Sequence, residues 1–185
     1  MSHSDQSAEV AYTASVAAAY ELDRRGERIW QLEQDHLERE LEDAPRGARI
    51  LDMPIGTGRF IQIYKKLGVQ VLGVDIAPAM LAEAKAKGSS SDVTLAIGDA
   101  SCIAAPDRSF DIVVCFRLLH LLPPEMLDPV IGELARVSSG CVYLQAYVRD
   151  KWYWPLRARR VLSRLIAGRS KSVTPWSHIR SYEHR

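Results

Sequence analysis

The sequence predicts an α/β domain built on a parallel β-sheet that helices cover on both faces. First, several short segments are almost continuously apolar, which is typical of parallel strands buried on both faces. Second, segments with helical patterning separate these apolar runs along the chain, as strand–helix–strand units require. The chain has 185 residues, enough for one such domain with a full core.

The first element expected is a long N-terminal helix. From residue 16 to about residue 41, apolar side chains recur with helical spacing. The side chains expected near one face are Ile29, Leu32, His36 and Leu37. Residues 43–48 (DAPRGA) end the helix, because proline and glycine interrupt helical backbone.

Strands and helices then alternate through the middle of the chain. Apolar runs predict strands at residues 49–53, 69–76, 93–100, 110–119 and 140–148. Helices are predicted at residues 59–68, 78–88 and 124–137. Pro78 near the start of the second of these helices and Gly88 at its end fit the positions that these residues favour. The crossovers between parallel strands are expected to be right-handed.

Charge is unevenly distributed along the chain. Residues 149–185 hold ten Lys or Arg and two Asp or Glu, whereas residues 1–148 hold fourteen basic and twenty-one acidic side chains. We therefore expect an N-terminal cover segment (1–44), a core (45–148) and a basic C-terminal segment with a different role. The basic segment suits an anionic substrate, an anionic membrane surface or RNA, and it equally suits a cover helix with a solvated basic face.

Other sequence features favour a cytoplasmic protein without a metal site. The N-terminus, MSHSDQSAEV, lacks the basic and apolar regions of a signal peptide, and no apolar run approaches membrane-spanning length. Cys102, Cys115 and Cys141 are widely spaced and form no zinc-binding pattern. A reduced, cytoplasmic setting fits this cysteine usage.

The segment LDMPIGTGRF (51–60), between the first core strand and the next helix, is the main candidate for a ligand site. Ligands bind beyond the carboxyl ends of strands in parallel sheets, and Gly56 and Gly58 permit positive φ and close backbone approach. The third glycine of a dinucleotide fingerprint would fall at Ile61, and no phosphate-loop pattern is present. Asp52 at the strand end would repel phosphate but attract a cation. An adenosyl ligand with an amino group and a sulfonium, S-adenosylmethionine, therefore fits.

ILDMPIGTGRF resembles motif I of class I S-adenosylmethionine-dependent methyltransferases, which usually reads hydrophobic-D-x-G-x-G-x-G. Asp52, Gly56 and Gly58 match the motif, and Pro54 takes the place of its first glycine. The resemblance implies that these four residues line the cofactor site.

The later motifs of the family follow in order. VLGVDIAPAML resembles the second motif, which implies that Asp75 binds the ribose hydroxyls and that Ile76 belongs to the same site. IGDASCIAAPDRSFDIVVC resembles the third and fourth motifs, which implies that Asp99 meets the adenine amino group beside Ala100 and Ser101. A structural alternative exists for two of them, since Asp75 suits a helix cap and Asp99 an Asx-turn.

The resemblance covers roughly residues 45–148 and implies a Rossmann-like parallel sheet with strand order 3-2-1-4-5. The family normally adds two further strands as a hairpin beside the fifth, and the residues after 148 do not read as strands. The fifth strand would then be an unprotected edge. The C-terminal segment covers it, a second chain covers it, or the chain is a truncated or naturally shortened form of the fold; of these we favour a homodimer.

The resemblance places the methyl acceptor at the end of the fourth strand. His120 lies just past this end and is the candidate general base, with packing against the cofactor as the alternative. Arg117 and, in the N-terminal segment, Tyr20 are the candidate substrate contacts. The alternatives are that Arg117 pairs only with a nearby carboxylate and that Tyr20 belongs to an amphipathic cover helix. We therefore expect an enzyme that methylates a small-molecule or lipid-like acceptor. The alternatives are an RNA methyltransferase and a cofactor-binding protein of this fold without catalysis.

Overall fold

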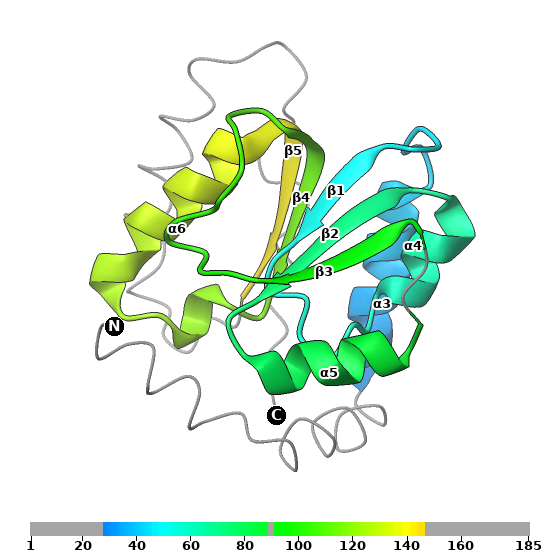
Figure 1. Cartoon of the computed structure of the whole chain (residues 1–185), viewed down its shortest axis with the longest axis horizontal. Helices are drawn as coiled ribbons and strands as arrows, with labels where there is room; N and C mark the ends of the chain where they lie inside the picture. Colours follow the sequence, from blue (N-terminus) through cyan, green and yellow to red (C-terminus); the bar gives the residue numbers. More distant parts are fainter. Residues whose placement is uncertain (1–27, 89–90, 147–185) are drawn as a thin grey trace.

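A computed structural model describes residues 28–88 and 91–146 of the chain (Figure 1). These residues form a parallel sheet of five strands in the order β3-β2-β1-β4-β5, with helices on both faces. The predicted α/β class, Rossmann-like architecture and strand order are thereby confirmed. Tyr20 and the basic segment 149–185 lie outside the described residues.

Each strand and helix predicted between residues 49 and 137 is present. The strands are β1 (Arg49–Asp52), β2 (Gln70–Asp75), β3 (Val93–Ile97), β4 (Phe110–Phe116) and β5 (Ser138–Gln145). The helices are α3 (Arg28–Leu41), α4 (Ile61–Leu67), α5 (Pro78–Ala86), α6 (Pro124–Val137) and the 3-10 helix η1 (Leu119–Leu121). Most boundaries differ from the prediction by one to three residues: β3, β4 and β5 each end three residues earlier, and β5 begins at Ser138 with no residue between it and α6.

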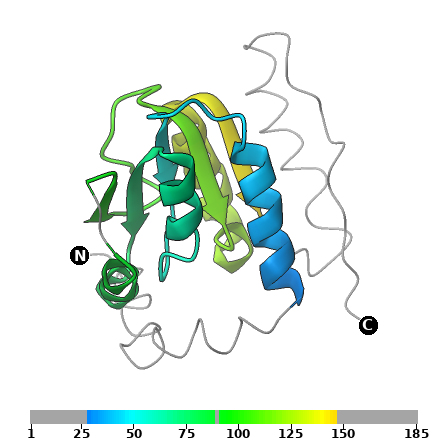
Figure 2. The ribbon, with the colours of Figure 1, turned by 90° about the vertical axis from the view of Figure 1, so that its right-hand side faces the viewer.

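Alternation of side chains across the sheet produces two apolar cores. Ile50 of β1 and Val114 of β4 belong to the core under α3 and α4, whereas their neighbours Leu51 and Val113 belong to the core under α6. Figures 1 and 2 show α6 on the opposite side of the sheet from α3 and α4. Because both faces of the central strands are covered, consecutive apolar residues of β1, β2 and β4 are buried, which is the pattern that made these strands recognisable.

The helix α3 buries a different face from the predicted one. Its buried residues are Trp30, Glu33, Leu37 and Leu41. The prediction was right for Leu37 but wrong for Ile29, Leu32 and His36, which are only partly buried. The physical reason is that Glu33, a residue normally excluded from a core, is neutralised by buried arginines and rotates the buried face toward itself.

Local signals set the helix ends as expected. Gly68 follows α4 with φ 66°, and its N–H bonds back to the carbonyls of Tyr64 and Lys65. Pro78 and Pro124 occupy the first turns of α5 and α6, where their missing N–H is not needed. Gly68 therefore ends α4 just before β2, and Pro78 begins α5 three residues after the carboxyl end of β2.

The strands β3 and β5 are the edges of the described sheet. Tyr143 of β5 donates its hydroxyl to the carbonyl of Glu40 at 3.2 Å, which ties the strand to α3. The chain beyond residue 146 lies outside the described part, so the absence of further strands and self-association through β5 stay predictions.

The described residues contain neither a membrane-spanning helix nor a metal cluster. No described helix is both long enough and apolar enough to cross a bilayer. Within the same part of the chain, no group of three His, Cys, Asp or Glu could hold a metal ion. The three cysteines are free thiols, and Cys115 is buried in β4.

Candidate functional site

The turn between β1 and α4 brings both predicted glycines to the carboxyl end of the sheet. Gly56 has φ 57° and Gly58 has φ 73°, in the region that side-chain-bearing residues rarely adopt. A Cβ on Gly58 would lie 2.5 Å from Ile61 and 3.0 Å from Ala84, so this glycine lets α5 pack against the turn. A Cβ on Gly56 would meet no atom within 4 Å. The space beside Gly56 is therefore open to a ligand. Pro54, in place of the first motif glycine, follows a cis peptide bond and is partly buried.

Asp75 ends β2 beside this turn and is 6% exposed. Its Oδ2 accepts the Gly56 N–H and its Oδ1 accepts the Ala77 N–H, each at 2.9 Å. Burial raises the pKa of this carboxyl, and the backbone N–H groups oppose the rise. A carboxylate has about four lone-pair sites, and its contacts with the backbone of Gly56, Ala77 and Ile76 leave at least one for a ligand hydroxyl. Asp75 therefore caps the turn before α5 and remains able to accept a ribose hydroxyl, and Ile76 follows it in a partly buried position.

Asp52 ends β1 and is 1% exposed. The Tyr64 hydroxyl donates to its Oδ2 at 2.9 Å, so the carboxyl is turned toward α4. Burial raises the pKa of Asp52 to about 7, while the Tyr64 hydrogen bond and the charge of Arg59 oppose the rise. A cationic group bound nearby would favour the ionised form. The attraction that Asp52 offers to a cation therefore depends on a charge that changes near neutral pH.

Asp99 lies two residues beyond β3 and forms the Asx-type turn. Its Oδ1 accepts both the backbone N–H and the hydroxyl of Ser101, each at 2.8 Å. Asp99 is exposed, and Ala100 and Ser101 are partly buried. The turn thus presents an exposed carboxylate at the same end of the sheet as Gly56.

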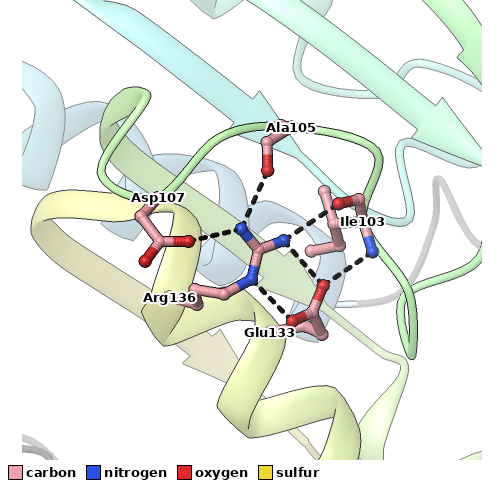
Figure 3. A network of polar contacts seen from close by, with 5 residues as sticks. All are labelled: Ile103, Ala105, Asp107, Glu133 and Arg136. Carbon is pink, nitrogen blue, oxygen red and sulfur yellow. Dashed lines mark hydrogen bonds and ion pairs between the residues drawn. The ribbon is translucent and has the colours of Figure 1, made fainter.

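One arginine holds the connection between β3 and β4 to α6 (Figure 3). Arg136 donates to the Asp107 carboxylate and to the carbonyls of Ala105 and Ile103, at 2.8–2.9 Å. It also donates twice to Glu133, at 2.7 and 2.8 Å, and Glu133 accepts the Ile103 N–H. All five guanidinium N–H groups are thereby used. This pairing raises the pKa of Arg136 and lowers that of Glu133, and it fixes the path of the connection that begins at the Asx-turn.

A buried cluster of charges lies between α3, the glycine turn and the end of β4. Oε2 of Glu33 is 2.8 Å from Nη1 of Arg59 and 2.8 Å from Nη2 of Arg117. The three side chains are only 8–9% exposed. The Arg59 guanidinium carbon lies 4.2 Å from the centre of the Trp30 ring and 4.3 Å from that of Phe60. Burial lowers the pKa of Arg59, and Glu33 opposes this change.

Sequence reasoning missed most of this cluster. Arg117 was expected to contact either an acidic substrate or a nearby carboxylate, and the structure pairs it with the carboxylate of Glu33. Trp30 and Glu33 are three residues apart on one helix, so they share a face, and Arg59 directly follows the glycine turn. This spacing was the available signal, but only the fold shows that the two helical residues meet Arg59.

The carboxyl end of β4 lies at the same end of the sheet as the glycine turn, because the strands are parallel. Arg117 has φ 61°, which is uncommon for a residue with a Cβ and is often found at functional sites. His120 follows in η1 and is partly buried. The structure therefore brings Asp52, Gly56 and His120 to the carboxyl end of the sheet, as the resemblance implies.

Comparisons with known proteins agree with this geometry. Residues 50–139 match a family described as a methyltransferase domain. The chain is 32% identical over 111 residues to phosphatidylethanolamine N-methyltransferase of Cereibacter sphaeroides, across 57% of this chain and 54% of the relative. It is 34% identical over 113 residues to malonyl-[acyl-carrier protein] O-methyltransferase of Yersinia pestis, across 61% of this chain and 38% of the relative. The solved structure of the PH0226 protein from Pyrococcus horikoshii OT3 superposes with a TM-score of 0.55 at 28% identity, across 64% of this chain and 59% of that one.

The family match over residues 50–139 includes the strands β2 to β4 and nearly all of β1, together with the glycine turn, Asp52, Asp75 and Asp99. The chain spans about half the length, or less, of these two curated relatives. S-adenosylmethionine is the methyl donor of the family. The match over residues 50–139 and the fold together support a methyltransferase domain of the class I S-adenosylmethionine-dependent type in this part of the chain.

Proposed function

We propose that the protein binds S-adenosylmethionine at the glycine turn and transfers its methyl group to a small-molecule or lipid-like acceptor. The observation that carries this proposal is the placement of Asp52, Asp75 and Asp99 at or just beyond the carboxyl ends of three neighbouring strands. The open space beside Gly56 lies at the same carboxyl end of the sheet. Carboxylates in this position disfavour a phosphate and favour a ligand with hydroxyls, an amino group and a cationic centre.

The side chains present fit such a ligand. Asp75 keeps at least one acceptor site for a ribose hydroxyl, and Ile76 adds apolar surface next to it. Asp99, with Ala100 and Ser101, presents an exposed carboxylate to the adenine amino group. Asp52, beside Pro54 and Gly58 in the turn, balances positive charge when ionised. When bound, S-adenosylmethionine supplies a methyl group already activated on a sulfonium.

The acceptor side of the site is the end of β4. We assign His120 as the group that accepts a proton from an acceptor hydroxyl or amine. Arg117 is only 8% exposed and is paired with Glu33, so an acidic acceptor would meet a guanidinium whose charge is already partly neutralised. Tyr20, the other proposed substrate contact, belongs to the undescribed N-terminal region.

The names of the relatives support a lipid-like acceptor. One is named for phosphatidylethanolamine, and the other for a malonyl group on an acyl-carrier protein. Both acceptors are lipids or intermediates tethered to a carrier rather than nucleic acids. We therefore rank a lipid-like or carrier-bound acceptor above RNA for this chain, and we propose that the protein acts in the cytoplasm.

Calorimetry with S-adenosylmethionine, S-adenosylhomocysteine and NAD tests cofactor binding. We expect the first two ligands to bind and NAD not to bind, and binding of NAD alone would overturn the proposal. A methyl-release assay against lipid, small-metabolite and RNA pools then tests the acceptor class. Turnover with RNA alone would favour the RNA methyltransferase reading. Cofactor binding without turnover in any pool would favour a cofactor-binding protein without catalysis.

A further inference from the structure

One carboxylate connects three segments that are far apart in the sequence. Glu33 lies in the middle of α3, Arg59 directly follows the glycine turn, and Arg117 directly follows β4. Oε2 of Glu33 lies 2.8 Å from a nitrogen of each arginine, and Arg117 also donates its Nε to the same oxygen at 3.0 Å. The N-terminal helix therefore contacts the cofactor side and the acceptor side of the proposed site through a single side chain.

Because the cluster is buried, each of its charges needs its partner for the folded state to be stable. All three side chains are at least nine-tenths buried, and a buried charge that loses its partner is strongly destabilising. Trp30, one helical turn before Glu33, stacks on Arg59 at 4.2 Å and lies 5.5 Å from Arg117. The charge and the aromatic ring on α3 thus hold the same two guanidinium groups.

A second ion pair between α3 and the domain is exposed and serves for comparison with the buried Glu33 pairs. Glu38 pairs with Lys66 of α4 on the exposed side of the helix, with side chains 30% and 72% exposed. Apolar packing by Leu37 and Leu41 already attaches the helix to the core. Since buried ion pairs add little net stability compared with apolar packing, attachment alone does not account for Glu33.

We propose that Glu33 is a positioning residue of the methyl-transfer site, which holds the glycine turn through Arg59 and the end of β4 through Arg117. This inference rests on the proposed function, because it concerns the turn at which S-adenosylmethionine would bind. It makes α3 a part of the site rather than a cover over it. Docking of α3 then fixes the distance between the cofactor turn and the acceptor side.

The pKa of Asp52 distinguishes a positioning role of Glu33 from a packing role, because a purely packing residue would leave this pKa unchanged. The charged or titratable side chains facing Asp52 are Arg59, Tyr64, Asp75 and Cys115. Glu33 neutralises Arg59, so its removal leaves more positive charge facing Asp52. The pKa of Asp52 should then fall, because a nearby positive charge favours the ionised carboxylate.

The test compares Glu33→Gln with Glu38→Gln, a matched control on the same helix. For Glu33→Gln we expect the Kd of S-adenosylhomocysteine to rise at least tenfold and the pH dependence of binding to move to lower pH. Hydrogen exchange should accelerate in residues 55–60 and 117–119. Glu38→Gln should leave all three measurements unchanged.

Should Glu33→Gln fail to fold, the pair Glu33→Gln/Arg117→Met restores the charge balance and takes its place in the affinity and exchange measurements. A folded Glu33 variant with wild-type affinity and exchange would overturn the positioning role, as would weaker binding with no shift in the pH dependence of Glu33→Gln. A wild-type protein that binds neither S-adenosylmethionine nor S-adenosylhomocysteine would refute the proposed function instead. Hydrogen exchange requires no ligand and would then still decide whether Glu33 holds the two segments.

Discussion

Replacing Asp52 with asparagine is expected to stabilise the cofactor-free protein at pH 8 and to weaken cofactor binding. Asp52 is 1% exposed, and burial raises its pKa from 3.8 to about 7. The folded protein therefore holds this proton more tightly than the unfolded chain does. Unfolding releases the proton between about pH 4 and pH 7, so the free energy of unfolding falls as the pH rises through this window.

The size of the effect follows from the shift in pKa. A rise from 3.8 to about 7 corresponds to about 4 kcal/mol of lost stability above pH 7, at about 1.36 kcal/mol for each pH unit. Asparagine avoids the buried charge, but its amide replaces an oxygen near the Tyr64 hydroxyl, at a cost of about 1 kcal/mol. We expect a net gain of about 3 kcal/mol at pH 8, and a gain smaller by about 2–3 kcal/mol at pH 5.

Urea unfolding of the wild type and of Asp52→Asn at pH 5 and pH 8, without cofactor, measures this difference. The exposed Asp35→Asn on α3 is the control, and we expect it to change stability little at either pH. A variant that is equally destabilised at both pH values would refute the reasoning, because it would mean that the folded protein stabilises the Asp52 charge.

Three further predictions concern the remaining parts of the site. Asp75→Ala should weaken binding of S-adenosylhomocysteine by about 1–3 kcal/mol and also lower the melting temperature, because two backbone N–H groups lose their acceptor; unchanged affinity in calorimetry would exclude the ribose contact. Arg136→Lys should weaken the same binding severalfold and accelerate hydrogen exchange between β3 and β4, because lysine cannot make the five hydrogen bonds of the guanidinium; slow exchange in the variant would contradict this. His120→Ala should reduce kcat at least tenfold with little change in cofactor Kd, and equal loss of both would assign His120 to packing.

The central strands could be predicted because β1, β2 and β4 are largely buried on both faces, whereas the strand order was implied by the family resemblance. Ile50 and Leu51, adjacent in β1, enter different cores, and this produces the apolar runs that mark strands in the sequence. The buried face of α3 could not be predicted in the same way. Glu33 is buried only because two arginines from other segments meet it, and helical periodicity carries no information about those partners.

In the candidate site, too, features set by the local chain could be predicted, and features set by distant partners could not. The turn glycines and Asp75 could be found because their spacing follows from the local path of the chain between a strand and a helix. The inward hydrogen bond from Tyr64 to Asp52 was not foreseen, since it depends on how α4 returns over β1. The contacts of Arg136 with residues 103–107 likewise depend on the packing of α6 against a connection about thirty residues earlier.

The direct junction of α6 and β5 has a consequence for how the chain tolerates changes in length. Val137 ends the helix, Ser138 begins the strand, and both are almost fully buried. An inserted residue would either turn the helix by about 100° or exchange the two faces of the strand, because no connecting residue absorbs the change. We therefore expect that insertions and deletions at this junction are not tolerated. The position at which α6 ends fixes which side chains of β5 meet β4.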